Sequence, residues 1–130
     1  MLVIRNEQIQ HFIAANEDER VSVVAAAVRK ACGNRVADFD DKQMATAVRI
    51  GIDRAKVHGL SNVEDLAAYI TVMLEVAPRF DEQPEIRQLL GDPNLRPPER
   101  FYLMMDRASD KAWCEAERRY EDSFWFPDAT

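Results

Sequence analysis

The fold is decided by residues 61–77, whose sequence is SNVEDLAAYITVMLEVA. Apolar side chains recur along this segment at intervals of three and four residues, as they do on one face of an α-helix. Tyr69, Val72 and Val76 make the other side of the segment apolar as well. Because a helix that is apolar nearly all round is enclosed by its neighbours, we expect this helix to be central and to end at Pro78.

Capping residues define where this helix and the one before it begin. Ser61 stands three residues before Glu64, which is the spacing of a capping box with Ser61 as the cap. The preceding helix is predicted to start near Asp40, since Asp40 and Asp41 are favourably placed at a positive helix end. It is predicted to stop at Gly59.

The inward stripe of that preceding helix contains a glycine. The apolar members of the stripe are Met44, Val48, Ile52 and Ala55. Gly51 lies on the same stripe, although a glycine in a helix interior costs about 1 kcal/mol against alanine. We expect a close crossing with another helix at Gly51 to offset this cost.

The first part of the chain is also predicted to be helical, apart from a short strand or extended arm at residues 2–4. Asn6 is suited to cap a first helix. The apolar face of that helix consists of Ile9, Phe12 and Ile13. Polar residues 16–20 indicate either a kink or a separate helix start. The apolar spacing resumes over residues 21–32, and residues 33–34, Gly-Asn, favour a left-handed cap that stops the helix.

Proline interrupts the last part of the chain. The prolines concerned are Pro84, Pro93, Pro97 and Pro98. We expect a short helix at residues 85–90, a Pro-rich connector at 91–98, and helices at 99–105 and 110–122. One face of the last helix is predicted to hold Trp113, Glu117, Tyr120 and Phe124. The chain therefore predicts a compact all-α single domain, a bundle-like or orthogonal arrangement of five or six helices.

The charge is acidic and unevenly distributed. Its formal value is −6, from 17 basic and 23 acidic side chains in 130 residues. Residues 1–60 sum to +1 and residues 61–130 to −7. This balance disfavours nucleic acid and anionic membranes as partners. An acidic half either maintains solubility or steers the protein toward a basic partner.

The apolar run at residues 1–4 is too short for a signal peptide, and no apolar stretch is long enough to cross a membrane. We therefore expect a cytoplasmic protein. Cys32 and Cys114 lie far apart without a CxxC pattern, so both are predicted to be free thiols.

Residues suited to catalysis are few. The two histidines, His11 and His58, have no cysteine, serine or aspartate nearby in a recognised catalytic pattern. His58 is predicted to face the negative end of a helix dipole. Because phosphate-binding, hydrolase and metalloprotease motifs are missing from the sequence, we predict a protein that is not an enzyme and uses no cofactor.

Acidic clusters do not predict a metal site. Residues 38–41 resemble the start of a calcium loop, but its sixth position is Gln43 and its twelfth is Arg49, instead of glycine and glutamate. A second group, interpreted as carboxylates at a helix start, consists of Asp81, Glu82 and Glu85.

Seven of the eleven aromatic residues lie within residues 101–126. They are Phe101, Tyr102, Trp113, Tyr120, Phe124, Trp125 and Phe126. Two interpretations remain open. Either these side chains close one end of the core, or they form a partly exposed patch that binds a protein partner, since Trp and Tyr are favoured interface anchors. We take the seven as candidate partner-binding residues.

Residues 1–90 also carry a pattern that resembles a group of known proteins. It opens with MLVIRNEQ at residues 1–8 and continues with RIGIDRA at residues 49–55. Further matching positions are His58-Gly59-Leu60, Glu64-Asp65-Leu66, Tyr69-Ile70, Met73 and Phe80-Asp81. The pattern is similar to small helical bacterial proteins encoded beside genes for the VgrG spike, the PAAR tip and toxic effectors of type VI secretion. Nothing beyond residue 95 takes part in it.

The resemblance implies a protein-binding role without chemistry. One such role is an accessory chaperone, co-chaperone or adaptor that holds an effector toxin, a PAAR or VgrG protein or another chaperone before loading. The breadth of the resemblance favours this role. The alternative is a cytoplasmic immunity protein that occludes a cognate toxin, and an acidic surface suits the basic cleft of a nuclease. The particular effector and the oligomeric state stay open.

Overall fold

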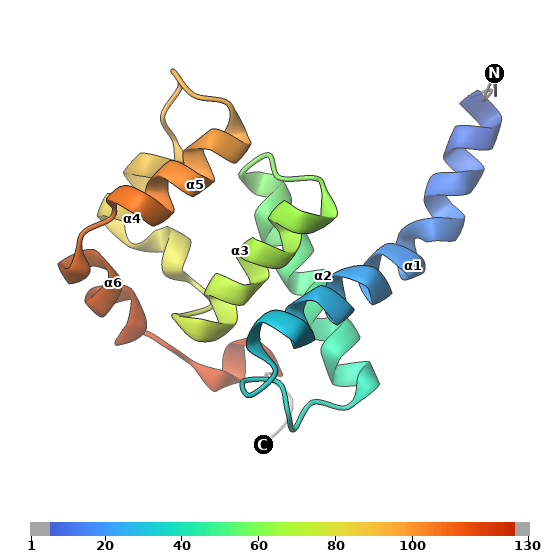
Figure 1. Ribbon diagram of the computed structural model, residues 1–130, viewed down its shortest axis with the longest axis horizontal. Coiled ribbons are helices and arrows are strands. Elements are labelled where there is room, and N and C mark those ends of the chain that lie inside the picture. The colour runs from blue at the N-terminus through green and yellow to red at the C-terminus, as the bar shows by residue number, and fades with distance from the viewer. Residues whose placement is uncertain (1–5, 127–130) are drawn as a thin grey trace.

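In the computed structural model, α3 lies between the pair α1 and α2 on one side and α4, α5 and α6 on the other (Figure 1). The structure describes the backbone of residues 6–126, with the side chains of residues 18–121 and 123–126. Over residues 6–126 it consists of helices and contains no strand. In chain order these are α1 (Asn6–Cys32), α2 (Asp41–Val57), α3 (Val63–Glu75), the 3-10 helix η1 (Phe80–Glu82), α4 (Pro84–Leu90), α5 (Pro97–Arg107), α6 (Asp110–Glu117) and the 3-10 helix η2 (Asp122–Phe124). The predicted all-α class is confirmed.

The central position predicted for α3 is confirmed as well. Its buried residues are Asp65, Leu66, Ala67, Tyr69, Ile70, Val72, Met73 and Leu74. The helix ends at Glu75, before Pro78 as expected. Its predicted cap is wrong by one residue, because α3 starts at Val63 and the N-cap is therefore Asn62 and not Ser61. The side chain of Asn62 accepts a hydrogen bond of 2.8 Å from the backbone N–H of Asp65.

The ends of α2 follow the sequence prediction. Asp40 is the N-cap, and its carboxylate accepts a hydrogen bond of 2.7 Å from the N–H of Gln43. The side chain of Gln43 in turn accepts from the N–H of Asp40 at 3.0 Å. Gly59 ends the helix with a φ of 77°, and its N–H donates to the carbonyl of Lys56 at 2.9 Å.

α2 and α3 approach each other most closely at Gly51. A Cβ atom on Gly51 would overlap Cγ1 of Ile70 in α3 and lie 2.9 Å from its Cδ1. The predicted close crossing is confirmed. The predicted inward stripe of α2 is buried throughout, at Met44, Val48, Ile52 and Ala55.

α1 is one helix over residues 6–32, so the predicted separate start at residues 16–20 is wrong. Glutamate and arginine, which predominate there, are good helix formers and continue the helix despite their polarity. The helix ends at Cys32 as expected, but Gly33 does not take the left-handed conformation, which Gly59 alone has among the described glycines. The expectation for residues 2–4 and the side chains of Ile9, Phe12 and Ile13 lie outside what the structure describes.

The last helices differ from their predicted bounds. α5 already begins at Pro97, because proline is favoured in the first turn of a helix, and the connector is shorter than predicted. α6 ends at Glu117, so Tyr120 and Phe124 do not share its face and that prediction is wrong. The chain leaves the helix because Trp125, which is 2 % exposed, enters the core.

Residues 118–126, called the C-terminal segment below, run back beneath α3 to the connection between α1 and α2 (Figure 1). The ring of Phe126 there meets that of Phe39 edge to face, with centroids 5.2 Å apart. The first third and the end of the described chain therefore pack together.

Two further expectations concern the described residues. Cys32 is buried and Cys114 exposed, and both are free thiols as predicted. No helix in the part of the chain that the structure describes is long and apolar enough to cross a membrane.

Candidate functional site

Asp81 in η1 is a buried carboxylate, with 8 % of its side chain exposed. It accepts a hydrogen bond of 2.5 Å from the hydroxyl of Tyr69 and another from the guanidinium of Arg54. Nε2 of His58 lies 3.0 Å from Oδ2 of Asp81, the same oxygen that accepts from Tyr69, whereas Arg54 donates to Oδ1. Because a buried charge is costly unless it is paired and hydrogen-bonded, these partners make the burial possible. We call the four residues the Asp81 cluster; it joins α2, α3 and η1.

The partners also determine ionisation in the cluster. Burial raises the pKa of Asp81, but hydrogen bonds from His58, Tyr69 and Arg54 outweigh it and lower the pKa to about 2. Burial and the neighbouring carboxylate raise the pKa of Tyr69 well above its usual range, so its hydroxyl stays a donor. Asp81 is therefore ionised and Tyr69 protonated at neutral pH, so the hydrogen bond between them persists over this whole range.

The interpretation of the acidic group as helix-start carboxylates is wrong for Asp81, whose side chain is buried in the cluster. Glu82 is exposed and lies 3.3 Å from Arg54 and 3.9 Å from Arg79. Glu85 stands in the first turn of α4 and accepts hydrogen bonds from the backbone N–H and hydroxyl of Ser109 at 2.5 and 3.0 Å. It thereby ties α4 to the start of α6.

The C-terminal segment contacts the Asp81 cluster through the aromatic ring of Phe124. The guanidinium groups of Arg54 and Arg79 each lie 5.5 Å from the ring centroid of Phe124. Nε of Arg54 is buried and has no hydrogen-bond partner in the structure. Phe124 therefore covers a cation that Asp81 holds from the other side.

The structure separates the seven predicted aromatic residues. Phe101 and Trp125 are core residues, 1 % and 2 % exposed. Tyr102 is 48 % exposed. The partly buried ones are Trp113, Tyr120, Phe124 and Phe126. Trp113, Phe124 and Phe126 also pack against the core while staying partly exposed, so core closure describes five of the seven to different degrees. Partner binding stays a prediction that concerns the five accessible residues.

Tyr102 stands on an accessible face of α5 beside apolar neighbours. A shallow pocket of about 420 Å³ is lined by Leu95, Glu99, Tyr102 and Leu103. These residues, with the exposed Met105 one turn further on, form what we call the α5 surface. The hydroxyl of Tyr102 donates to Asp65 at 2.6 Å, and this bond with partial burial raises its pKa to about 12. The exposed ring is therefore fixed in one orientation.

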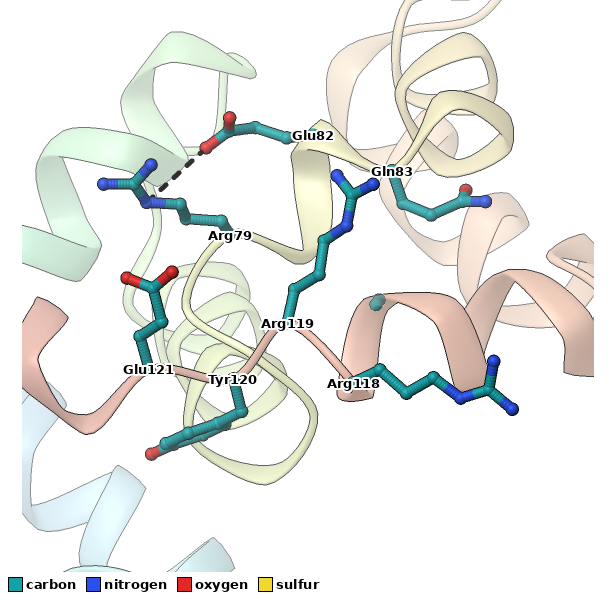
Figure 2. A pocket seen from close by; sticks show the side chains of 8 residues that line it. Arg79, Glu82, Gln83, Arg118, Arg119, Tyr120 and Glu121 are labelled. Atoms are coloured by element: carbon teal, nitrogen blue, oxygen red, sulfur yellow. Dashed lines mark ion pairs between the residues drawn. The ribbon is translucent and has the colours of Figure 1, made fainter.

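A second pocket lies between η1 and the end of α6 (Figure 2). It measures about 410 Å³, and we call it the arginine pocket. It is lined by Arg79, Glu82, Gln83, Ala116, Arg118, Arg119, Tyr120 and Glu121. Figure 2 shows Arg119 extending from the end of α6 toward Gln83, with Arg79 across from it and Arg118 directed outward.

The Asp81 cluster and the arginine pocket were not predicted from the sequence. One signal for the cluster was available: Tyr69 places a hydroxyl on a helix that is otherwise apolar, and a buried hydroxyl requires a partner. Arg54 and His58, four residues apart on α2, face the same way and could have been considered for it. The pocket has no local signature, because its arginines come from two segments.

Among the residues that the structure describes, no group of three or more His, Cys, Asp and Glu side chains is placed to hold a metal ion. The chain matches no protein-family model, and neither a curated protein nor a solved structure is found to be similar to it.

Proposed function

We propose that this protein is a non-catalytic accessory protein of a type VI secretion effector module, which binds another protein as a chaperone, co-chaperone or adaptor for effector loading. The setting is taken from the resemblance of residues 1–90. The observation that carries the binding role is the α5 surface, where an aromatic ring is exposed and yet held in place.

The α5 surface has the chemistry of a protein contact. Tyr102 offers a large amphipathic ring, the kind of side chain that is enriched among residues contributing most to binding. Its bond to Asp65 restricts the ring before a partner arrives, so less conformational entropy is lost on binding. Met105 is unbranched and adapts to an irregular partner surface.

The residues that carry the resemblance serve the scaffold in this chain. Gly51 makes the crossing of α2 and α3, while Arg54, Tyr69 and Asp81 belong to the Asp81 cluster. Recognition is then left to the residues after 97. A shared scaffold with a separate variable surface suits adaptors that serve different partners.

The test uses the purified protein and the spike, tip and effector proteins encoded beside its gene, with dissociation constants measured by calorimetry. Tyr102→Ala is expected to weaken binding at least about tenfold, because it removes a preorganised aromatic anchor. Val57→Ala is the matched control, since Val57 is 80 % exposed and stands on α2. Failure of all these proteins to bind, or equal weakening by both variants, would contradict the proposal.

The alternative role of an immunity protein is favoured by one observation, the charge of −7 in residues 61–130, which suits a basic toxin. Deleting the gene separates the two roles. Lost effector secretion with unchanged survival beside sister cells indicates the adaptor. Sensitivity to sister cells that carry the toxin indicates immunity.

A further inference from the structure

We propose that the arginine pocket binds a short acidic peptide segment, whose separate carboxylates are held by the guanidinium groups of Arg79 and Arg119, with Arg118 at the mouth of the pocket. This site is separate from the α5 surface. The inference rests on the proposed function only in assigning the peptide to a protein partner.

The charge of the arginine pocket is opposite to that of its surroundings. Residues 61–130 contain eight basic and fifteen acidic side chains, and three of the eight basic ones line this pocket. Glu82 and Glu121 line it too, so the excess is a single positive charge. That excess matches one or two carboxylates, whereas the net charge of −6 repels a polyanion such as nucleic acid.

The guanidinium groups of these arginines have N–H donors that no ion pair occupies. Arg118 and Arg119 are exposed, and within residues 18–121 and 123–126 neither guanidinium forms an ion pair. Arg79 approaches Glu82 through Nε at the long distance of 3.9 Å, and it forms no other ion pair within these residues. A guanidinium presents five N–H donors in a planar fork that fits a carboxylate bidentately.

The guanidinium groups come from two segments, which distinguishes the arginine pocket from a simple helix-end effect. Arg118 and Arg119 follow the C terminus of α6, where the helix dipole by itself favours cations. Arg79 precedes η1 and is oriented by its contact with the Phe124 ring. Arg79 and Arg119 therefore line the same pocket from different elements, and their guanidinium groups point in different directions, each toward its own end of the pocket (Figure 2).

Two residues that line the arginine pocket, Gln83 and Tyr120, are held in place before any ligand binds. Gln83 is buried; its Nε2 donates to Glu115 and its Oε1 accepts from the N–H of Ile86, both at 2.9 Å. The Tyr120 ring lies 5.8 Å from the guanidinium of Arg35, and its hydroxyl accepts from the indole N–H of Trp125 at 3.3 Å. Because these groups already have their partners, a carboxylate binds without rearranging them.

The test measures the fluorescence anisotropy of a fluorescein-labelled peptide with two carboxylates, Gly-Glu-Gly-Glu-Gly-amide, titrated with the full chain at low ionic strength. The double variant Arg118→Glu/Arg119→Glu is expected to bind at least about tenfold more weakly, because the charge inside the pocket and at its mouth is reversed. The matched control is Arg87→Glu/Arg107→Glu, which changes the net charge equally at exposed positions on α4 and α5. It is expected to stay within about threefold of the unmodified chain.

Two results would overturn the inference: no saturable binding of the two-carboxylate peptide by the unmodified chain, or equal weakening in both double variants. Preferential binding of an oligothymidylate of six nucleotides, lost in the pocket variant, would assign the site to phosphate and overturn it too. Circular dichroism confirms that each variant is folded. Because the probe is synthetic, none of these results bears on the Tyr102 test of the proposed function.

Discussion

At the scale of single residues, Asp81 connects three elements of the fold, α2, α3 and η1, and no motif in the sequence predicts this connection. Its carboxylate receives the hydroxyl of Tyr69 from α3 and the guanidinium of Arg54 from α2. Removing the charge leaves Arg54, with a quarter of its side chain exposed, facing an uncharged partner. Breaking one side of a largely buried pair costs more than the pair contributes relative to apolar packing.

Asp81→Asn is therefore expected to lower the free energy of unfolding by about 3 kcal/mol in urea titrations at pH 7. Glu82→Gln is the control, because Glu82 meets the same arginine at 3.3 Å but is 54 % exposed, and a change below about 1 kcal/mol is expected.

The same substitution changes the pH dependence of stability. The pKa of Asp81 is lowered from its ordinary value of 3.8 to about 2, so the folded state binds this proton less readily than the unfolded state does. The stabilisation is complete above the unfolded pKa and is lost as the pH falls toward 2, by about 2 kcal/mol. Urea titrations from pH 5 to 2 should show a steeper decline for the unmodified chain than for Asp81→Asn. Parallel curves would contradict the assigned role.

Some features of single residues were predictable from the sequence alone. The helix stop at Gly59 and the helix-end position of His58 follow from local rules. The pairing of His58 with Asp81 does not, because 23 residues separate them and only the tertiary fold brings them to 3.0 Å.

At the scale of elements, the crossing of α2 over α3 depends on the missing side chain at Gly51. Its position on an apolar stripe predicted a close approach, and Ile70 occupies the space that a Cβ would need. The approach lets two helices with mostly aliphatic faces pack closely around the centre of the fold.

Gly51→Ala is expected to lower the free energy of unfolding by about 2 kcal/mol, because overpacking outweighs the helix propensity gained by alanine. Gly91→Ala is the matched control. A Cβ there lies 3.5 Å from its nearest neighbour and the residue has a φ of −99°, so a change below about 0.5 kcal/mol is expected. Equal thermal midpoints for the unmodified chain and Gly51→Ala would refute the close crossing.

Element type was predictable from the sequence, whereas two boundaries were not. Periodicity and capping residues predicted α2, α3 and α4 well. The continuity of α1 through residues 16–20 follows from the helix propensity of glutamate and arginine, which outweighs their polarity. The early end of α6 accompanies the burial of Trp125, a tertiary feature that no local pattern predicts. The arginine pocket likewise arises from two segments that no local pattern connects.

At the scale of the whole molecule, the C-terminal segment closes the core against the first third of the chain. Trp125 is buried, Phe126 meets Phe39, and Arg35 stacks on Tyr120. These contacts join residues that are far apart in sequence, and they make the stability of the N-terminal helices depend on the last described residues.

Trp125→Ala is therefore expected to destabilise the whole domain by about 3 kcal/mol or more. Maleimide labelling measures this directly. Cys114 is exposed and reacts in the folded state, whereas Cys32 is buried and its thiol pKa is raised by burial, so it reacts only when the core opens. The variant should label Cys32 about a hundredfold faster, with Cys114 unchanged.

Val57→Ala is the control for that experiment, since it shortens a side chain on α2 that is 80 % exposed and should leave the Cys32 rate as it is. An unchanged Cys32 rate in Trp125→Ala would mean that the C-terminal segment is an appendage and not a part of the core.

The meeting of Phe126 with Phe39 also bears on biosynthesis. A ribosome delivers the chain from its N terminus, so α1, α2 and α3 emerge well before the indole that completes their core. Until residue 126 has left the ribosome, the apolar surface that receives Trp125 is open to nascent chains and to chaperones of the cell. Truncated mRNAs that end before this point would yield chains whose helices form but whose core lacks Trp125. Quality-control proteases should degrade these chains.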